Sequence, residues 1–214
     1  MTPALARHAT RIAESIVMSA AHKLSLISVE DYLAAELRSE TKHEYLGGVI
    51  HAMAGGSFNH NTIALNVATT LRTQLRGKRC RPFNSDTKIR VDLPNLVKFY
   101  YPDASVICEP LPPQQSFHNA PVVVVEVLSR STRRIDMDEK KNAYLAIPSL
   151  VAYIMIEQND PLAVVFRRSQ EDVFQREVYE GLDAVIHLPE IETDLALSDV
   201  YEDVTFTPEP DEET

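Results

Sequence analysis

The chain has 214 residues, 44% of them hydrophobic, and a formal net charge of −10 at pH 7. This length can bury one sizeable core, so we expect a single domain at 23–205 between a disordered leader (1–22) and a disordered acidic tail (206–214). No apolar run approaches the about eighteen residues of a membrane span, and no membrane partner is expected.

The negative charge is concentrated at the C-terminal end. From Glu190 to Thr214 there are ten acidic residues and neither Lys nor Arg, so the first 189 residues are neutral overall. By contrast, residues 72–90 hold seven basic residues and a single acid, Asp86. Basic patches on a neutral body permit contact with phosphate groups, although solvated surface charge explains any one of them equally well. The composition therefore does not exclude a nucleic-acid partner.

Two cysteines, Cys80 and Cys108, lie too far apart in sequence for a CxxC pair. No His–His or His–Cys spacing suggests a transition-metal site, so zinc is not expected. We expect two free thiols, which suit a reducing cytoplasm, and therefore a cytoplasmic protein.

The first half of the chain combines helical and strand signals. Ser28 can cap a helix, Gly77 can end one, and residues 92–95 form a turn after a strand. The elements predicted in this half are a short helix at 28–37, a helical turn leading into a strand within 41–53, an amphipathic helix from Ser57 to about Arg76, and a strand at 81–91.

The most distinctive stretch is the valine-rich run at 121–129, which contains one carboxylate, Glu126. Such a run is typical of a strand buried on both faces, where an ionised carboxylate is costly unless a cation pairs with it. Upstream, residues 100–108 predict another strand with Asp103 at its mouth. A proline-rich connection of about a dozen residues can lay the two strands side by side. Two carboxylates converging from neighbouring strands are typical of a site for a hard divalent cation.

The second half predicts a helix and several strands. Ser131, Thr132 and Asp136 can cap a helix that runs to about Ala146. Further strands are predicted at 151–156, 163–167 and 173–179. The whole order predicts a mixed β-sheet flanked by helices, in the α/β (α+β) class.

An ordered set of short motifs extends over roughly residues 28–200. It comprises Glu44 in His43-Glu-Tyr-Leu-Gly-Gly48, His60 at the start of the long helix, Tyr101-Pro-Asp103, Val124-Val-Glu-Val-Leu-Ser129, Asp138-Glu-Lys140 with Tyr144, and the strand around Tyr153. This set resembles the Uma-type restriction endonuclease family of the PD-(D/E)XK nuclease superfamily. The resemblance implies a restriction-endonuclease-like fold, double-stranded DNA as the substrate and a homodimer.

The sequence departs from the superfamily pattern at its lysine. Leu128 stands two residues after Glu126, where the superfamily has Lys, and Lys140, four residues before Tyr144, matches the displaced lysine of the Uma-type family. Arg130 replaces a usual proline, and Ile154 replaces a common tryptophan.

Phosphodiester hydrolysis requires an activated water and stabilisation of the charge that develops on phosphate oxygens, and Mg²⁺ (or Mn²⁺) can supply both. We assign Asp103 as the bridging metal ligand and Glu126 as the second ligand. The superfamily resemblance implies the backbone carbonyl of Val127 as a third. Lys140 could orient the water or stabilise the oxyanion, and Glu44 could serve as an outer metal ligand.

Each of these residues also has a structural explanation. Asp103 could belong to a turn, Lys140 to a solvated helix face, His60 to a helix start, and Glu44 to a local pair. Glu126 could form a structural ion pair with Lys140 or Arg133. The alternative function is therefore a catalytically inactive nucleic-acid or protein-binding module on the same fold. A carboxylate-pair glycosidase is a poorer third, since the chain has no Trp to form a sugar platform.

Overall fold

The computed structural model describes residues 26–110, 112–129 and 133–206. The predicted leader lies outside these residues, as does the predicted tail beyond Phe206. The helices are α2 (Val29–Glu36), α3 (Phe58–Gln74), α4 (Arg133–Ile135), the π-helix η1 (Asp136–Lys140), α5 (Lys141–Leu145), the 3₁₀ turn η2 (Pro189–Ile191) and α6 (Leu197–Val200). The strands are β1 (His43–Leu46), β2 (Val49–Ala52), β3 (Arg81–Asn84), β4 (Lys88–Leu93), β5 (Leu96–Tyr100), β6 (Ala104–Ile107), β7 (Phe117–His118), β8 (Pro121–Leu128), β9 (Ala152–Glu157), β10 (Leu162–Arg168), β11 (Phe174–Glu180), β12 (Val185–Leu188) and β13 (Thr193–Ala196).

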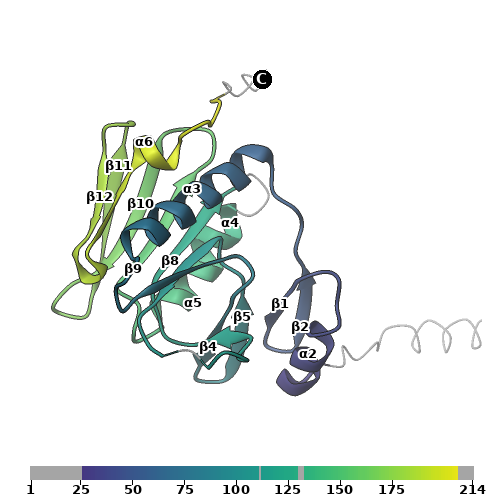
Figure 1. Ribbon diagram of the computed structural model, residues 1–214. Helices are drawn as coiled ribbons and strands as arrows, with labels where there is room; N and C mark the ends of the chain where they lie inside the picture. The colour runs from purple at the N-terminus through teal and green to yellow at the C-terminus, as the bar shows by residue number, and fades with distance from the viewer. Residues whose placement is uncertain (1–25, 111, 130–132, 207–214) are drawn as a thin grey trace, which may run out of the picture.

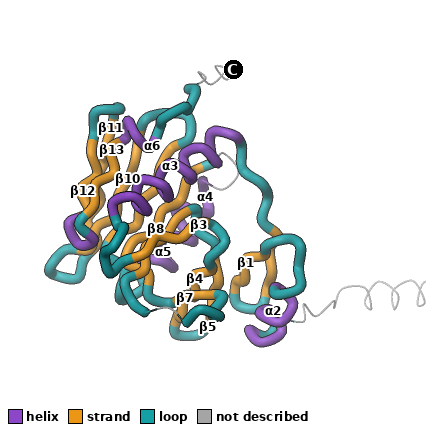
Figure 2. The backbone as a smooth tube through the Cα atoms, viewed as in Figure 1, coloured by secondary structure: helices purple, strands orange, loops and turns teal. Residues whose placement is uncertain are grey.

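The strands form a large mixed sheet with two smaller sheets beside it (Figure 2). The large sheet has the order β11-β10-β9-β8-β6-β3, in which β8 and β9 are parallel and the other neighbours antiparallel. A second sheet has the order β2-β1-β5-β4-β7, and β12 pairs with β13. The α+β class with a mixed sheet and flanking helices is therefore confirmed, with the predicted strands divided among separate sheets.

Strand β8 lies in the middle of the large sheet and is buried on both faces, as its valine-rich sequence predicts. Val123, Val125 and Val127 face one core cluster, together with Ile63, Val67 and Leu71 of α3. Val124 and Leu128 face a second cluster, together with Tyr144 of α5. In Figure 1, α3 crosses one side of the sheet while α4 and α5 lie on the other. Glu126 has the same parity as Val124, and it points to the side of α5.

Local signals correctly predict both longer helices. The Ser57 side chain accepts a hydrogen bond from the backbone N–H of His60 and caps α3, and Gly77 follows the helix with φ of +77°. Ser28 caps α2 in the same way, accepting from the N–H of Asp31. The cap residues predicted for the later helix, Ser131 and Thr132, lie outside the described residues.

Two predictions of local structure are wrong. Residues 41–53 contain no helical turn; they form the β1–β2 hairpin, which turns at Gly47 and Gly48 with φ of +59° and +105°. The single strand predicted at 81–91 is two strands, β3 and β4, which belong to different sheets. A turn closed by a hydrogen bond from the N–H of Thr87 to the carbonyl of Asn84 separates them.

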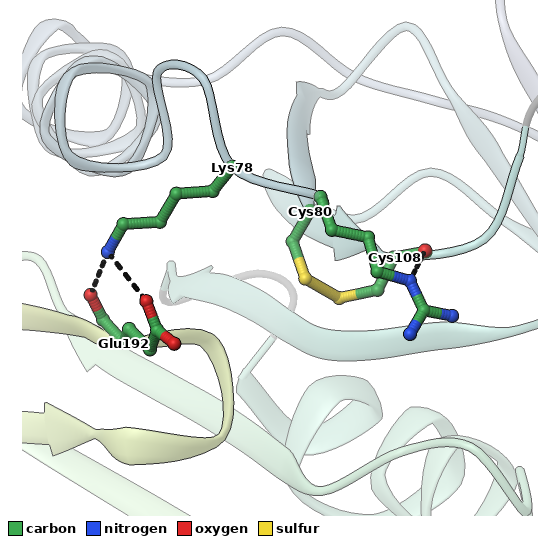
Figure 3. The surroundings of a disulfide bond; sticks show 5 residues. Lys78, Cys80, Cys108 and Glu192 are labelled. Carbon is green, nitrogen blue, oxygen red and sulfur yellow. Dashed lines mark hydrogen bonds and ion pairs between the residues drawn. A yellow bond between two sulfur atoms is a disulfide. The ribbon is translucent and has the colours of Figure 1, made fainter.

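The prediction of free thiols is also wrong, because Cys80 and Cys108 form a disulfide (Figure 3). β3 pairs with β6 in an antiparallel register that sets Arg81 opposite Ile107, so the two cysteines are the next pair outward. Sequence separation alone does not reveal such a pairing, since the cysteines are 28 positions apart and the chain between them leaves and returns to the same sheet edge. The expectation of a cytoplasmic protein loses the argument that rested on free thiols. Among the described residues, no helix is long and apolar enough to cross a membrane.

Candidate active site

The candidate site lies where β6 begins and β8 ends. Asp103 immediately precedes β6, and the register that pairs Ala104 with Val125 continues to Asp103 opposite Glu126. Helix α3 brings His60 to one side of this point, η1 brings Lys140 to the other, and β1 contributes Glu44. Residues far apart in the sequence therefore meet at one edge of the central strands.

Asp103 is held by a backbone group and by a histidine. Its Oδ2 accepts a hydrogen bond of 2.7 Å from the N–H of Val127, and it lies 3.3 Å from Nε2 of His60. Burial alone would lower the pKa of His60, but the contact with Asp103 outweighs it, so the pKa is raised above its ordinary value. These contacts fix the Asp103 carboxylate at the mouth of β6.

The backbone carbonyl of Val127 points toward the same place. The N–H of Val127 donates to Oδ2 of Asp103, which precedes β6, and the N–H and C=O of one strand residue point to the same neighbouring strand. Continuing the register would set Val127 opposite Pro102, which has no N–H to donate. No backbone N–H of that residue can therefore bond the Val127 carbonyl, which by strand geometry faces the Asp103 side. This arrangement leaves the Val127 carbonyl suited to a cation.

Lys140 lies at the centre of the site, ringed by three carboxylates. Its Nζ is 3.0 Å from Oε1 of Glu44, 3.3 Å from Oδ1 of Asp136 and 3.4 Å from Oε1 of Glu126. The hydroxyl of Tyr144 also donates to Oε1 of Glu126, at 3.2 Å. Lys140, Glu126 and Asp136 are all buried.

The excess of buried acid raises the affinity of both partners for protons. Burial raises the pKa of Glu126 well above its ordinary value, opposed by Lys140 and reinforced by Asp136, Asp103 and Glu44. Burial would lower the pKa of Lys140, but the three surrounding carboxylates outweigh it and raise that pKa instead. Lys140 is therefore charged at neutral pH, and three carboxyl groups share its single ammonium.

Two carboxylate oxygens in this ring lack a hydrogen bond. Oε1 of Glu44 and Oδ1 of Asp136 are buried and form none among the described residues, although both lie within ion-pair distance of Lys140. Each of these oxygens relies on the Lys140 ammonium, which Glu126 also contacts, instead of on a donor of its own. Both oxygens retain capacity for another partner.

Sequence reasoning missed Asp136 as a site residue and treated it only as a helix cap. It lies four residues before Lys140 on η1, and both side chains point into the site. A π-helix is rare and is frequently found at functional sites. The i, i+4 spacing of an acid and a lysine is visible in the sequence, but only the packing of η1 against β8 shows that both are buried.

The donor set fits a hard divalent cation in its chemistry. Carboxylate and carbonyl oxygens are the ligands that Mg²⁺ prefers, and the orphaned oxygens of Glu44 and Asp136 can accept one. Within the described part of the chain, no three Asp, Glu, His or Cys side chains already stand close enough together to hold a metal ion. The carboxylates would therefore have to draw together around a metal ion.

The sequence model of the Uma2 family, described as "Putative restriction endonuclease", matches residues 29–199. The chain belongs to the Uma2 family. The resemblance seen in the sequence is thus confirmed, and membership in Uma2 implies a nuclease and a nucleic-acid substrate.

Two relatives from Synechocystis sp. PCC 6803 are similar to the chain. "Uncharacterized protein slr1290" is 33% identical over 181 residues, which cover 84% of this chain and 94% of that protein. "Uncharacterized protein sll1609" is 30% identical over 136 residues, covering 62% of this chain and 76% of that protein.

A solved structure supports the fold. The crystal structure of a "putative nuclease belonging to DUF820" from Anabaena variabilis superposes with a TM-score of 0.66 at 19% identity. The match covers 82% of this chain and 98% of that one. The restriction-endonuclease-like fold expected for Uma2 is therefore shared with a solved protein.

Proposed function

We propose that the chain is a Mg²⁺-dependent endonuclease, also active with Mn²⁺, that hydrolyses phosphodiester bonds in DNA. The observation that carries this proposal is the convergence of Glu44, Glu126 and Asp136 on one buried ammonium, that of Lys140, with Asp103 close enough to Glu126 for its charge to act there. Such a concentration of buried acid is costly in a merely structural site and is relieved by a divalent cation.

Asp103, Glu126 and the carbonyl of Val127 would hold the metal ion, with Glu44 as an outer ligand. The ion, when bound, lowers the pKa of a water and draws charge from the phosphate. The chain's own residues do the remaining work. The Val127 N–H and His60 orient Asp103, and Lys140 supplies a positive charge for the attacking water or the developing oxyanion.

A shell of tyrosines keeps this site dry on the side of α5. Tyr144 packs between Tyr100 and Tyr153 with its ring tilted against both, at centroid distances of 5.3 and 5.4 Å. Burial raises the pKa of Tyr144 well above its ordinary value, so its hydroxyl keeps its proton and donates to Glu126. Excluding water strengthens each electrostatic contact inside the site.

Double-stranded DNA and a homodimer complete the proposal, because one site cuts one strand and two copies could cut both. The cytoplasm is the location that goes with a DNA substrate. The competing function is a catalytically inactive nucleic-acid or protein-binding module, in which Lys140 only neutralises the acids. The ion pairs of Lys140 with Glu44, Glu126 and Asp136 are what favours that alternative.

Cleavage of supercoiled plasmid with Mg²⁺ or Mn²⁺ tests the proposal. Asp103→Ala and Lys140→Ala should each lower the cleavage rate on the order of 100-fold or more, since each removes a charge that acts on the transition state. Asp138→Ala and Lys141→Ala, which change the same helical segment outside the ring, are matched controls and should cleave at the wild-type rate.

The outcomes separate the candidate functions. Loss of cleavage in Asp103→Ala alone would keep the metal site and remove Lys140 from the chemistry. If clean wild-type protein cleaves no form of DNA with either metal, the nuclease proposal fails and the binding module takes its place.

A further inference from the structure

Asp136 is the most deeply buried acid of the site and has no assigned function. Its residue is 1% exposed, and its Oδ1 forms no hydrogen bond within the described residues. Its Oδ1 lies 3.3 Å from Nζ of Lys140, and its charge helps to raise the pKa of Glu126. Tyr153 donates a hydrogen bond to its backbone carbonyl and holds this end of η1 in place.

A buried carboxylate with an unused oxygen needs an explanation. Burying a charge without directed partners is costly in general, and native proteins leave few such groups. The 3.3 Å contact with Lys140 is only a partial answer, since the same ammonium is shared with Glu44 and Glu126. Three carboxyl groups share one ammonium, so a divalent cation in its place would match them better in charge.

We propose that Asp136 is a ligand of the divalent cation, and that Lys140 occupies the carboxylate ring until the cation binds. This inference rests on the proposed metal-dependent function and adds a ligand and a displacement step to it.

The distances around Lys140 are those of an ammonium and not those of a metal ion. Its three carboxylate contacts are 3.0, 3.3 and 3.4 Å, whereas Mg²⁺ binds oxygen at about 2.0–2.1 Å. The ring must therefore contract by roughly 1 Å around a metal ion. An ammonium and a divalent cation cannot share that space, so one excludes the other. Once displaced, the Lys140 ammonium is free to act on the water or the phosphate.

Asp136 and Lys140 both lie on η1, which couples binding of the metal ion to displacement of the ammonium. Asp136 begins the π-helix and Lys140 ends it, four residues later. Movement of the Asp136 carboxylate toward a metal ion and away from Nζ would break the contact that spans the helix. The helix η1 therefore supplies both the additional metal ligand, Asp136, and the ammonium that the metal ion displaces, that of Lys140.

Mn²⁺ binding, measured by titration calorimetry and by the rise in Tm on adding Mn²⁺, tests this inference on the full chain without DNA. Asp136→Asn keeps the side-chain shape and should weaken Mn²⁺ binding at least about 10-fold, the loss expected when a charged ligand becomes a neutral one. Asp138→Asn, an exposed acid on the same turn, is the matched control and should bind Mn²⁺ as the wild type does. Lys140→Met removes the competing ammonium, so it should bind Mn²⁺ at least about 10-fold more tightly and show a larger rise in Tm.

Each outcome decides the proposal. Unchanged Mn²⁺ affinity in Asp136→Asn, with only a lower Tm, would make Asp136 a structural partner of Lys140. Unchanged or weaker affinity in Lys140→Met would show that the lysine does not compete; Lys140→Gln measures the same competition if Lys140→Met does not fold. Wild-type protein that neither binds Mn²⁺ nor cleaves DNA would overturn this inference and the proposed function together. Wild-type binding that Asp136→Asn leaves unchanged overturns this inference alone.

Discussion

Two lysines of the molecule are equally buried and have opposite surroundings. Lys140 and Lys88 are both 6% exposed. Lys140 lies among three carboxylates, whereas none of the ion pairs between described residues involves Lys88, whose Nζ lies 5.2 Å from the ring centre of Tyr101. Burial lowers the pKa of Lys88 despite the opposing charge of Glu36, while the carboxylates raise the pKa of Lys140. The two lysines are thus equally buried, and the number of acids around each decides whether its pKa is raised or lowered.

This contrast indicates which of the two sites is suited to binding a cation. Around Lys88 the protein tolerates a buried cation with an aromatic ring as its main neighbour. Around Lys140 it has gathered more acid than one ammonium can offset. A structural ion pair needs one acid for one base, so the additional acids at Lys140 suit a divalent cation that takes the place of the ammonium.

Among substitutions of these lysines, we expect the largest change in the free energy of unfolding at Lys140. Lys140→Met in EDTA leaves the carboxylates of Glu44, Glu126 and Asp136 buried without their cation. Unfolding by urea should show a loss of about 3–5 kcal/mol, the cost of removing one partner of a buried ion pair. A loss below about 1 kcal/mol would mean that water already solvates these acids.

A smaller effect of opposite sign is expected at Lys88. Because the pKa of Lys88 is lowered in the folded state, the unfolded chain binds more protons, and the stability contributed by this group rises as pH increases toward its ordinary pKa of 10.5. Lys88→Met removes the cost of the buried charge and should stabilise the protein by about 1 kcal/mol at pH 7. The gain should shrink as pH approaches 10.5, because wild-type Lys88 is then neutral when folded. Urea unfolding of the wild type and Lys88→Met at pH 7 and pH 9.5 measures the gain and its decrease. A lower stability of Lys88→Met at pH 7 would contradict the comparison.

The smallest change in the free energy of unfolding is expected at Lys42, which is more exposed than the other two lysines. Its side chain is 39% exposed, pairs with Asp86 and lies 5.8 Å from the same Tyr101 ring. Lys42→Met should change the free energy of unfolding by no more than about 0.5 kcal/mol, as for exposed ion pairs generally. The measurement is the same urea titration at low and high salt. An effect as large as that of Lys140→Met would show that exposure does not separate these lysines.

Sequence patterns predicted the parts of the fold that local physics determines. The valines around Glu126 specify a buried strand whatever lies beside them, and Ser57 with Gly77 marks both ends of α3. The hairpin turn before Leu96 follows from its Pro and Asn. Local signals were weaker at β1, where His43-Glu-Tyr-Leu46 is short, polar and compatible with a helical turn.

The remaining parts depend on contacts between distant residues. The break between β3 and β4 occurs because the chain changes sheets there, and the Cys80–Cys108 pairing depends on the register of β3 with β6. In the site, the motif indicated Asp103, Glu126, Lys140 and Glu44, and the structure brings all four to one place. Only tertiary packing shows that Asp136 is a fifth member.

The disulfide closes the chain into a ring that holds β3, β4, β5 and Asp103 between its two ends. When the oxidised chain is pulled from its termini, tension passes through the sulfur atoms and bypasses this segment. Full extension would therefore be shorter by about 90 Å than for the reduced chain, taking roughly 3.4 Å for each bypassed residue. The Asp103 segment would remain slack under a load that straightens the rest of the protein.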